Sequence, residues 1–256
     1  MSKNEAVFGI HSVTAVLQHA PERALELFVQ KDRDDPAIQE IVKAARAAGV
    51  RPQFCQRKTL DERVDKDSTH QGVLLLVTPG RAYQENDLPE LAQQAGQKAL
   101  FLILDQVTDP HNLGACLRTA DAAAVTAVIV PKDKAAGLNA TVRKVASGAA
   151  EIVPLVTATN LARALRILKD EGVWVTGTAG EATVGLYENK FVGPVAIVMG
   201  AEGTGMRRLT RELCDDLVSI PLSGTVSSLN VSVAAGVCLF EVVRQRAAQA
   251  GKGSAK

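Results

Sequence analysis

The chain has 256 residues, a formal net charge of +1 and four cysteines without C-x-x-C spacing. Its 46% hydrophobic and 22% charged residues are typical of a globular protein with one large or two small domains. The small net charge argues against a protein that grips nucleic acid over its whole surface, and the cysteine spacing predicts reduced thiols in the core. No apolar stretch reaches the roughly 18 residues that span a bilayer, so we expect a cytoplasmic protein without a membrane partner.

Residues 1–78 are predicted to form a small α/β domain. The apolar stretch 24–29 predicts a strand, and residues 36–48 carry apolar side chains at helical spacing until Gly49 ends the helix. The continuous apolar segment 72–77 predicts a buried strand, which Pro79 and Gly80 terminate. The polar composition of residues 79–98 predicts an interdomain linker with room for a short helix.

Residues 99–247 are predicted to form a second domain, because strands and helices alternate there. We expect strands at 100–104, 127–130, 152–156, 173–177, 195–199 and 217–220. We expect helices at 113–124, 140–146, 161–171, 207–214 and 229–246. This alternation predicts an α/β fold with a doubly wound parallel sheet, in which ligands bind at the carboxyl ends of the strands. Residues 248–256 are predicted to be a disordered tail.

The first motif, D-Q-V-T-D-P-H-N-L-G-A-C-L-R, occupies residues 105–118 and leads from the first strand of this domain into a helix. Asn112 is expected to cap that helix by accepting a hydrogen bond from a main-chain donor. Arg118 lies beside the apolar stripe of the helix, where alanine or leucine would pack better. The arginine either extends to the surface along its aliphatic stem or belongs to a functional site.

The second motif, M-G-A-E-G-T-G-M, occupies residues 199–206 directly after an apolar strand. Glycines at this place allow the main chain to approach a ligand closely. A dinucleotide fingerprint would need glycine where Arg208 stands, and no G-K-[ST] follows to make a Walker-type phosphate loop. The motif could be no more than a tight turn. Glu202, however, is a lone carboxylate among glycines with no role in apolar packing, which favours a functional site.

The third motif, I-P-L-S-G-T-V-S-S-L-N-V, occupies residues 220–231 and leads from the last strand into the final helix. Ser227, Ser228 and Asn230 could serve only as helix caps and turn formers, as most such clusters do. None of the three motifs is decisive alone.

Together, the order N-x-x-x-x-x-R, G-x-E-G and S-L-N-V, each placed at a strand end, resembles the knotted RNA 2′-O-ribose methyltransferases of the SpoU/TrmH (SPOUT) type. The resemblance covers nearly all of residues 99–247, including 125–133 and 142–154. It extends to F-G-I-H at 8–11 and H-Q-G at 70–72. It implies a deep trefoil knot near the C-terminus of the parallel α/β domain, and a small N-terminal α/β domain that binds RNA.

The resemblance also implies S-adenosyl-L-methionine as the cofactor, held largely by main-chain groups. The residues implied to hold it are Gly200, Gly203, Ile220, Leu229, Thr178 and Ala179. The implied catalytic residues are Arg118, Asn112, Glu202, Ser228 and Asn230. Asn112 and Glu202 would position Arg118 and the cofactor loop, while Ser228 and Asn230 would hold the ribose or the first motif.

Arg118 is implied to activate the ribose hydroxyl, but arginine stays protonated at neutral pH. Either an RNA phosphate or the field of the site makes it act as a base, or it orients the hydroxyl and stabilises the developing alkoxide. We favour the second role.

The extent of the resemblance implies methylation of a guanosine ribose in the peptidyl-transferase region of 23S rRNA during large-subunit maturation. It also implies a homodimer in which Arg118 faces the cofactor of the partner subunit. RNA contacts would come from local basic clusters, each of which could equally be a solvated helix face. These clusters are Arg207-Arg208 with Arg211, Arg143-Lys144, and Lys132 with Lys134.

Two alternatives stay open: a tRNA ribose methyltransferase of the same superfamily, and a non-catalytic RNA-binding protein on this fold. A Rossmann-type methyltransferase would need a glycine-rich loop where residues 105–108 are D-Q-V-T. We expect no metal, because the four histidines lie far apart in sequence: His11, His19, His70 and His111.

Overall fold

The computed structural model of the chain describes residues 4–33, 35–64 and 69–253. Two compact units are present, and each is described on its own. Unit 1 comprises Met1–Arg81 and Leu138–Ile152, and unit 2 comprises Ala82–Gly137 and Val153–Lys256. The predicted α/β class is confirmed, whereas the predicted domain limits stay predictions.

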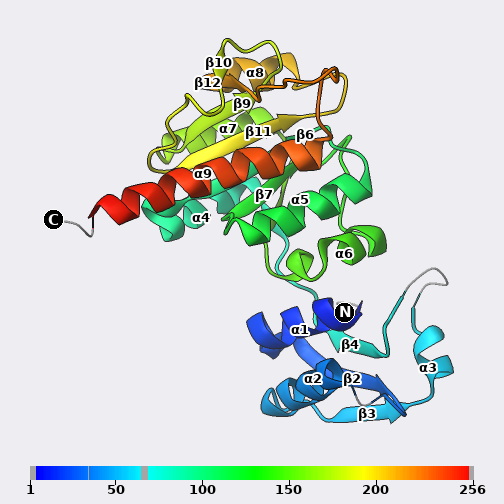
Figure 1. Ribbon diagram of the computed structural model, residues 1–256. Helices are drawn as coiled ribbons and strands as arrows, with labels where there is room; N and C mark the ends of the chain where they lie inside the picture. Colours follow the sequence, from blue (N-terminus) through cyan, green and yellow to red (C-terminus); the bar gives the residue numbers. More distant parts are fainter. Residues whose placement is uncertain (1–3, 34, 65–68, 254–256) are drawn as a thin grey trace. The chain divides into compact units, whose positions relative to one another are not determined.

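Unit 1 is built on a four-stranded sheet in the order β1-β4-β2-β3 (Figure 1). The central strand β4 lies antiparallel to β1 and β2, and the edge strand β3 lies parallel to β2. The strands are β1 (Glu5–Phe8), β2 (Ala24–Gln30), β3 (Pro52–Cys55) and β4 (Val73–Val77). The helices are α1 (Ile10–His19), α2 (Pro36–Ala47), α3 (Arg57–Asp61) and α6 (Ala140–Ala146), with 3-10 turns η1 (Pro21–Arg23) and η4 (Ala149–Glu151).

Both faces of this sheet are buried. Leu27, Val29 and Leu75 pack with α1 and α2 on one face, and Phe28 and Leu74 pack with α3 on the other. The predicted strands at 24–29 and 72–77 and the helix at 36–48 are confirmed within two residues. β1, α1, β3 and α3 were not predicted.

Unit 2 is built on an eight-stranded sheet in the order β10-β12-β9-β11-β6-β7-β8-β5, with every strand parallel to its neighbours. The strands are β5 (Tyr83–Gln84), β6 (Leu100–Asp105), β7 (Ala127–Pro131), β8 (Leu155–Ala158), β9 (Trp174–Thr178), β10 (Val184–Gly185), β11 (Val195–Gly200) and β12 (Asp216–Ser219). The helices are α4 (Leu88–Ala95), α5 (Pro110–Ala122), α7 (Leu161–Asp170), α8 (Arg208–Leu213) and α9 (Val231–Gly253).

Helices cover both faces of the eight-stranded sheet. α5 and α9 pack together on one face, and α4, α7 and α8 follow one another on the other face (Figure 1). The central strands β6, β7 and β11 are buried along nearly their whole length. Such continuous apolar strands are the expected signature of a parallel sheet that is covered twice.

The six strands predicted in this unit are all present, with β8 shifted toward the C-terminus. The shift arises because residues 149–151 form the turn η4, so the extended conformation begins only after Pro154. The two-residue strands β5 and β10 were not predicted. α9 continues to Gly253 and overlaps the predicted tail at 248–256, whose last three residues lie outside the described residues.

The segment 79–98, predicted as a linker, carries ordered elements. It contains β5, α4 and the 3-10 turns η2 (Glu85–Asp87) and η3 (Gly96–Lys98). Leu88 and Leu91 of α4 are buried against α7, so a polar composition conceals a helix with one apolar face.

Candidate active site

The three motifs meet at one edge of the parallel sheet. Asp105, the last residue of β6, lies in register with Gly200, the last residue of β11. β9 and β12 end at the same side, with Thr178 paired to Val218. Because the carboxyl ends of parallel strands share an edge, the loops that follow these strands converge as the sequence predicted.

A hydrogen-bonded junction joins one residue from each motif. Asn230 donates from Nδ2 to Asn112 Oδ1 at 2.9 Å and to Glu202 Oε1 at 2.8 Å. Asn112 Nδ2 lies 3.3 Å from the same Glu202 oxygen, which also accepts from the main-chain N–H of Val231 at 3.2 Å. One carboxylate oxygen therefore connects the loop after β11 to α5 and to the start of α9.

Asn112 does not cap α5, so the predicted capping role is wrong. The helix begins at Pro110, and Asp109 is its N-cap residue, accepting from the main-chain N–H of His111 at 2.9 Å. Proline is favoured at the first helical position, where its missing N–H leaves no donor unsatisfied. Asn112 stands in the first turn and uses its amide for the junction instead.

A cavity of about 440 Å³ opens beside the junction. Its walls come from segments 178–181, 199–206, 218–222 and 227–229, together with Arg211, Val231 and Ala234. All six residues predicted to hold the cofactor line it: Thr178, Ala179, Gly200, Gly203, Ile220 and Leu229. Glu202 and Ser228 line it as well, whereas Asn112, Arg118 and Asn230 do not.

The loop over this cavity has main-chain groups available for a ligand. Among the described residues, no hydrogen bond uses a main-chain group of residues 221–229. Gly200 is needed on the opposite wall, because a Cβ there would lie 2.2 Å from the main-chain carbon of Gly205. The donor set thus fits a cofactor that is held largely through the backbone.

An ion pair between Glu181 and Arg211 lies on the wall of the cavity. The hydrogen bond from Arg211 holds the pKa of the Glu181 carboxyl below its usual value, which keeps it ionised. With Glu202, the lining carries two carboxylates and one guanidinium. A ligand with a net positive charge would suit this balance.

The sequence model of the SpoU rRNA Methylase family matches residues 99–240, the part of the chain that carries all three motifs. The chain belongs to this family. The predicted family membership is therefore confirmed. A second family model, for RNA 2′-O ribose methyltransferase substrate binding, matches residues 6–83.

Individual relatives match different shares of the chain. The 23S rRNA (guanosine-2′-O-)-methyltransferase RlmB of Escherichia coli strain K12 is 59% identical over 243 residues, covering 95% of this chain and 99% of that protein. The SpoU methyltransferase AviRb from Streptomyces viridochromogenes, solved with AdoMet, has 24% identity and a TM-score of 0.76 over 95% of this chain and 90% of its own, which shows a shared fold. The TrmH/SpoU tRNA modifying enzyme of A. aeolicus has 29% identity and a TM-score of 0.55, and covers 65% of this chain and 85% of its own.

Arg118, the residue implied to be essential in this family, lies on the exposed surface of α5. Within the described part of the chain it makes no hydrogen bond or ion pair, so Glu202 does not hold it as the sequence predicted. One carboxylate oxygen of Glu202, Oε1, instead accepts from the donors of the junction. Within one copy of the chain, Arg118 therefore lies outside the cavity.

One buried residue of the site region was missed from the sequence. Asp105 is fully buried, and it accepts from the main-chain N–H of Arg207 at 2.9 Å and from its Nε at 2.7 Å. The signal was available, because a carboxylate ends the apolar run L-F-L-I-L-D at 100–105. Arg207, considered as an RNA contact, instead fixes the end of the second motif to β6.

Other site classes gain no support. Among the described residues, no group of three histidine, cysteine or acidic side chains could hold a metal ion. None of the described helices is both long and apolar enough to cross a membrane. The four cysteines are free, as predicted, and Cys116 and Cys238 are buried.

Proposed function

We infer that this protein transfers a methyl group from S-adenosyl-L-methionine to the ribose 2′-hydroxyl of a guanosine in 23S rRNA. The observation that carries the substrate is the 59% identity to RlmB, which runs through both the substrate-binding and the methylase parts of the chain. The tRNA modifying enzyme, by contrast, covers only 65% of this chain. We propose that the protein acts in the cytoplasm and that its target lies in the peptidyl-transferase region.

The main-chain groups that line the cavity support its assignment as the cofactor site. S-adenosyl-L-methionine supplies a methyl group on a positively charged sulfonium. Gly200, Gly203, Ile220, Leu229, Thr178 and Ala179 would hold it, mainly through backbone groups. We propose that the Asn112–Glu202–Asn230 junction keeps the loops on both sides of this cavity in place, and that Ser228 on its wall holds the ribose.

Arg118 is proposed to orient the ribose hydroxyl and to stabilise the alkoxide that develops on it. A hydroxyl is a poor nucleophile and needs polarisation or proton removal in the transition state. Arg118 is exposed and has no ion pair within the described residues, so its donors are available, and its guanidinium remains charged throughout the reaction. In this role Arg118 does not have to lose a proton, so the pKa of its guanidinium does not have to be lowered.

We propose that two copies of the chain complete each site, so that Arg118 of one copy faces the cavity of the other. The position of Arg118 outside its own cavity supports this arrangement. α9 also presents an apolar stripe at helical spacing, of which Val233 and Phe240 are about half exposed. We further propose that the chain near the C-terminus forms the trefoil knot of this family.

The function is tested by methyl transfer from labelled cofactor to unmodified 23S rRNA and, in parallel, to tRNA. We expect label in 23S rRNA at one guanosine ribose, located by ribose-methylation mapping. If only tRNA is labelled, the protein is instead a tRNA ribose methyltransferase of the same superfamily. An absence of transfer to either RNA, with intact cofactor binding, would favour a non-catalytic RNA-binding protein.

A further inference from the structure

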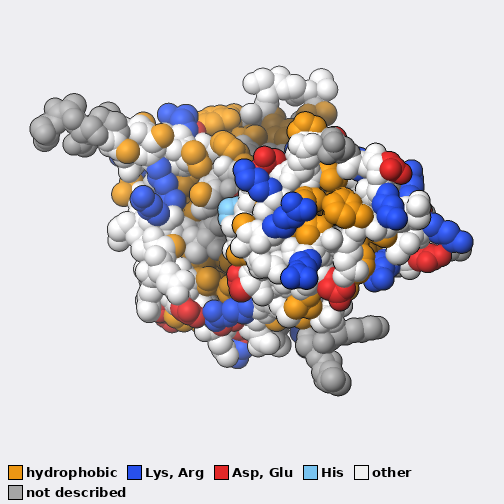
Figure 2. Space-filling view, turned by 90° about the horizontal axis from the view of Figure 1, so that it is seen from below, with side chains coloured by type: hydrophobic (Ala, Val, Ile, Leu, Met, Phe, Trp, Pro, Cys, Tyr) orange, Lys and Arg blue, Asp and Glu red, His pale blue; other side chains and the backbone are white. Residues whose placement is uncertain are grey.

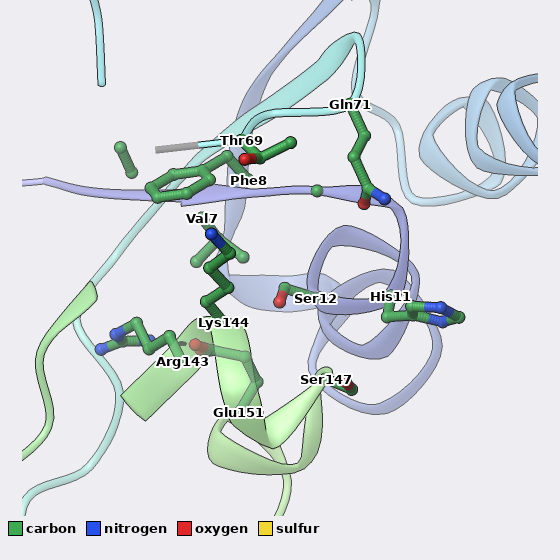
Figure 3. A pocket seen from close by; sticks show the side chains of 12 residues that line it. Val7, Phe8, His11, Ser12, Thr69, Gln71, Arg143, Lys144, Ser147 and Glu151 are labelled. Atoms are coloured by element: carbon green, nitrogen blue, oxygen red, sulfur yellow. Dashed lines mark hydrogen bonds and ion pairs between the residues drawn. The ribbon is translucent and has the colours of Figure 1, made fainter. Parts of the chain in front are cut away.

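A second pocket, in unit 1, has a volume of about 220 Å³ and is lined by segments that the cofactor cavity does not use (Figure 3). Phe8, Gly9 and His11 come from the F-G-I-H motif, and Gln71 comes from the H-Q-G motif. Lys144, from one of the basic clusters, lines the other side. Three sequence features that the methyl-transfer site leaves unexplained therefore meet in one pocket.

The two N-terminal motifs form a rigid wall. Gly9 and Gln71 both adopt a positive φ, of 86° and 51°, a conformation that is costly for glutamine. Gln71 Oε1 accepts from the main-chain N–H of Ile10 at 3.0 Å, and so caps α1 in place of a side chain at Gly9. His70 Nδ1 accepts from the N–H of Gly72 at 3.0 Å and fixes the second motif in turn. Strain of this kind is maintained at sites that must be preorganised.

A polar group without a protein partner faces this pocket. Ser12, on α1, is only 8% exposed and lines the pocket. Its hydroxyl takes part in no hydrogen bond among the described residues, and Figure 3 shows it pointing into the space between α1 and α6. The hydroxyl therefore keeps its donor and its acceptor available for a polar ligand in the pocket.

The charge of the pocket is concentrated on Lys144. Arg143 is paired with Glu5 at 3.1 Å and with Glu151, which also pairs with Arg23 at 3.4 Å. Lys144 is exposed and has no ion pair within the described part of the chain. It extends from α6 toward the strand that carries Phe8 (Figure 3). One uncompensated positive charge thus stands opposite an aromatic ring.

The face of the protein shown in Figure 2 carries no broad positively charged area for RNA. On the face shown in Figure 2, lysine and arginine side chains lie interspersed with acidic and apolar ones and form no continuous tract. This agrees with the net charge of +1. Both observations favour RNA binding at local sites.

We propose that this pocket binds one unstacked nucleotide of the substrate RNA, with the phosphate at Lys144, a polar group at Ser12 and the base against Phe8. Sequence-specific RNA recognition favours splayed-out bases that stack on aromatic side chains and bond to polar groups. The volume of about 220 Å³ is below the roughly 300–1,000 Å³ of pockets for drug-sized ligands, so it suits the base alone, with the phosphate outside at the exposed Lys144. The nature of the RNA rests on the proposed function, but the pocket is separate from the cofactor cavity.

The experiment compares Lys144→Glu with Lys43→Glu in the full chain. Lys43 is exposed on α2, lies outside the pocket and has no ion pair within the described residues, so it controls for the change in net charge. Binding of an unmodified 23S rRNA transcript is measured by filter retention at several salt concentrations without cofactor. We expect Lys144→Glu to weaken binding about tenfold and to lower the salt slope by about 1. Equal effects of the two variants would overturn the proposal.

A second arm tests the nucleotide itself. Ser12→Leu fills the pocket without changing charge and should reduce RNA binding, provided that its circular dichroism shows a folded protein. Ultraviolet crosslinking of the wild type should leave a nucleotide on the peptide that contains Phe8. Crosslinks that all lie elsewhere would contradict the pocket, even if Ser12→Leu fails to fold. If the wild type binds RNA through Lys144 but transfers no methyl group, the proposed function fails and the pocket stands.

Discussion

Asn230 donates its amide to the same Glu202 oxygen that Asn112 contacts, across 2.8 Å and 3.3 Å respectively. Three segments that are far apart in sequence are thereby held at one acceptor atom. Ser232 adds a further hydrogen bond, since its hydroxyl donates to Asn230 Oδ1 at 2.6 Å. The amide of Asn230 is therefore used on both its donor and its acceptor side, and its chemistry is difficult to replace.

Asn230→Asp tests whether this junction holds the cofactor cavity open. Aspartate has nearly the same shape, but it cannot donate and it places a second negative charge beside Glu202. We expect cofactor affinity, measured by titration calorimetry, to fall about tenfold or more. Asn139→Asp is the matched control, because Asn139 caps α6 and aspartate caps a helix equally well. Wild-type affinity in Asn230→Asp would show that the junction is dispensable.

Gly200→Ala tests the close approach within the second motif. A Cβ at this position would lie 2.2 Å and 2.3 Å from main-chain atoms of Gly205 and Met206, so the loop has to move. We expect unfolding in urea to show a loss of about 1–3 kcal/mol, together with weaker cofactor binding. Gly137→Ala should be nearly neutral, because nothing lies within 4 Å of its Cβ position. Equal stability of the two variants would contradict this account.

The alternation of apolar strands and helices was sufficient to predict the parallel sheet and the edge where its loops meet. Every strand predicted in unit 2 is long enough, or buried enough, to leave a periodic signal. The edge strand β3 has only four residues, two of them exposed, so it leaves none. α1 was not predicted because no local capping residue marks its start. Its N-terminus is capped by Gln71, which lies 61 residues from Ile10 in sequence.

The site could be predicted as a set of loops but not as a set of contacts. Asn112 was assigned to a cap because asparagine is a good capping residue, while the better signal, Asp109 before Pro110, was overlooked. The position of Asn112 opposite Glu202 depends on the register of β6 with β11, which no local pattern contains. The same register hides the pairing of Asp105 with Arg207.

Asp105→Asn tests the buried carboxylate under the second motif. Its two oxygens accept one bond each from Arg207, and asparagine keeps only one acceptor, so a donor is left unpaired. We expect a loss of about 1–3 kcal/mol in the free energy of unfolding. Asp121→Asn, on the exposed side of α5, should leave stability unchanged. The prediction is wrong if both variants unfold at the same urea concentration.

The buried thiols should make the protein less stable at alkaline pH. Burial raises the pKa of Cys116 and Cys238 to about 12, against 9.0 for an unperturbed thiol. Because the pKa is higher in the folded protein, their contribution to stability is complete below pH 9 and is lost as the pH rises toward 12. At pH 10 each thiol should account for a loss on the order of 1 kcal/mol. Urea unfolding at pH 8 and pH 10 should show a smaller difference for Cys116→Ala than for the wild type, and an unchanged difference would refute the assignment.

Arg118→Ala should abolish methyl transfer while leaving folding and cofactor affinity intact. The side chain is exposed, has no hydrogen bond or ion pair among the described residues and lies outside the cofactor cavity, so its removal disturbs neither. Loss of a group that stabilises a developing oxyanion typically costs about 10²–10³ in rate. Arg118→Lys should fail too, because a point charge does not reproduce the planar guanidinium fork. Full activity in either variant would remove Arg118 from the mechanism.

A mixed dimer decides whether Arg118 serves its own cavity or that of the partner. One chain carries Arg118→Ala with an intact cavity, and the other carries Leu229→Trp, which blocks the cavity and keeps Arg118. Neither chain is expected to be active alone. If Arg118 acts across the interface, the mixed dimer contains one complete site, and methyl transfer to 23S rRNA reappears. If Arg118 acts within its own chain, no complete site forms. An inactive mixed dimer that still binds one cofactor would therefore exclude the shared site.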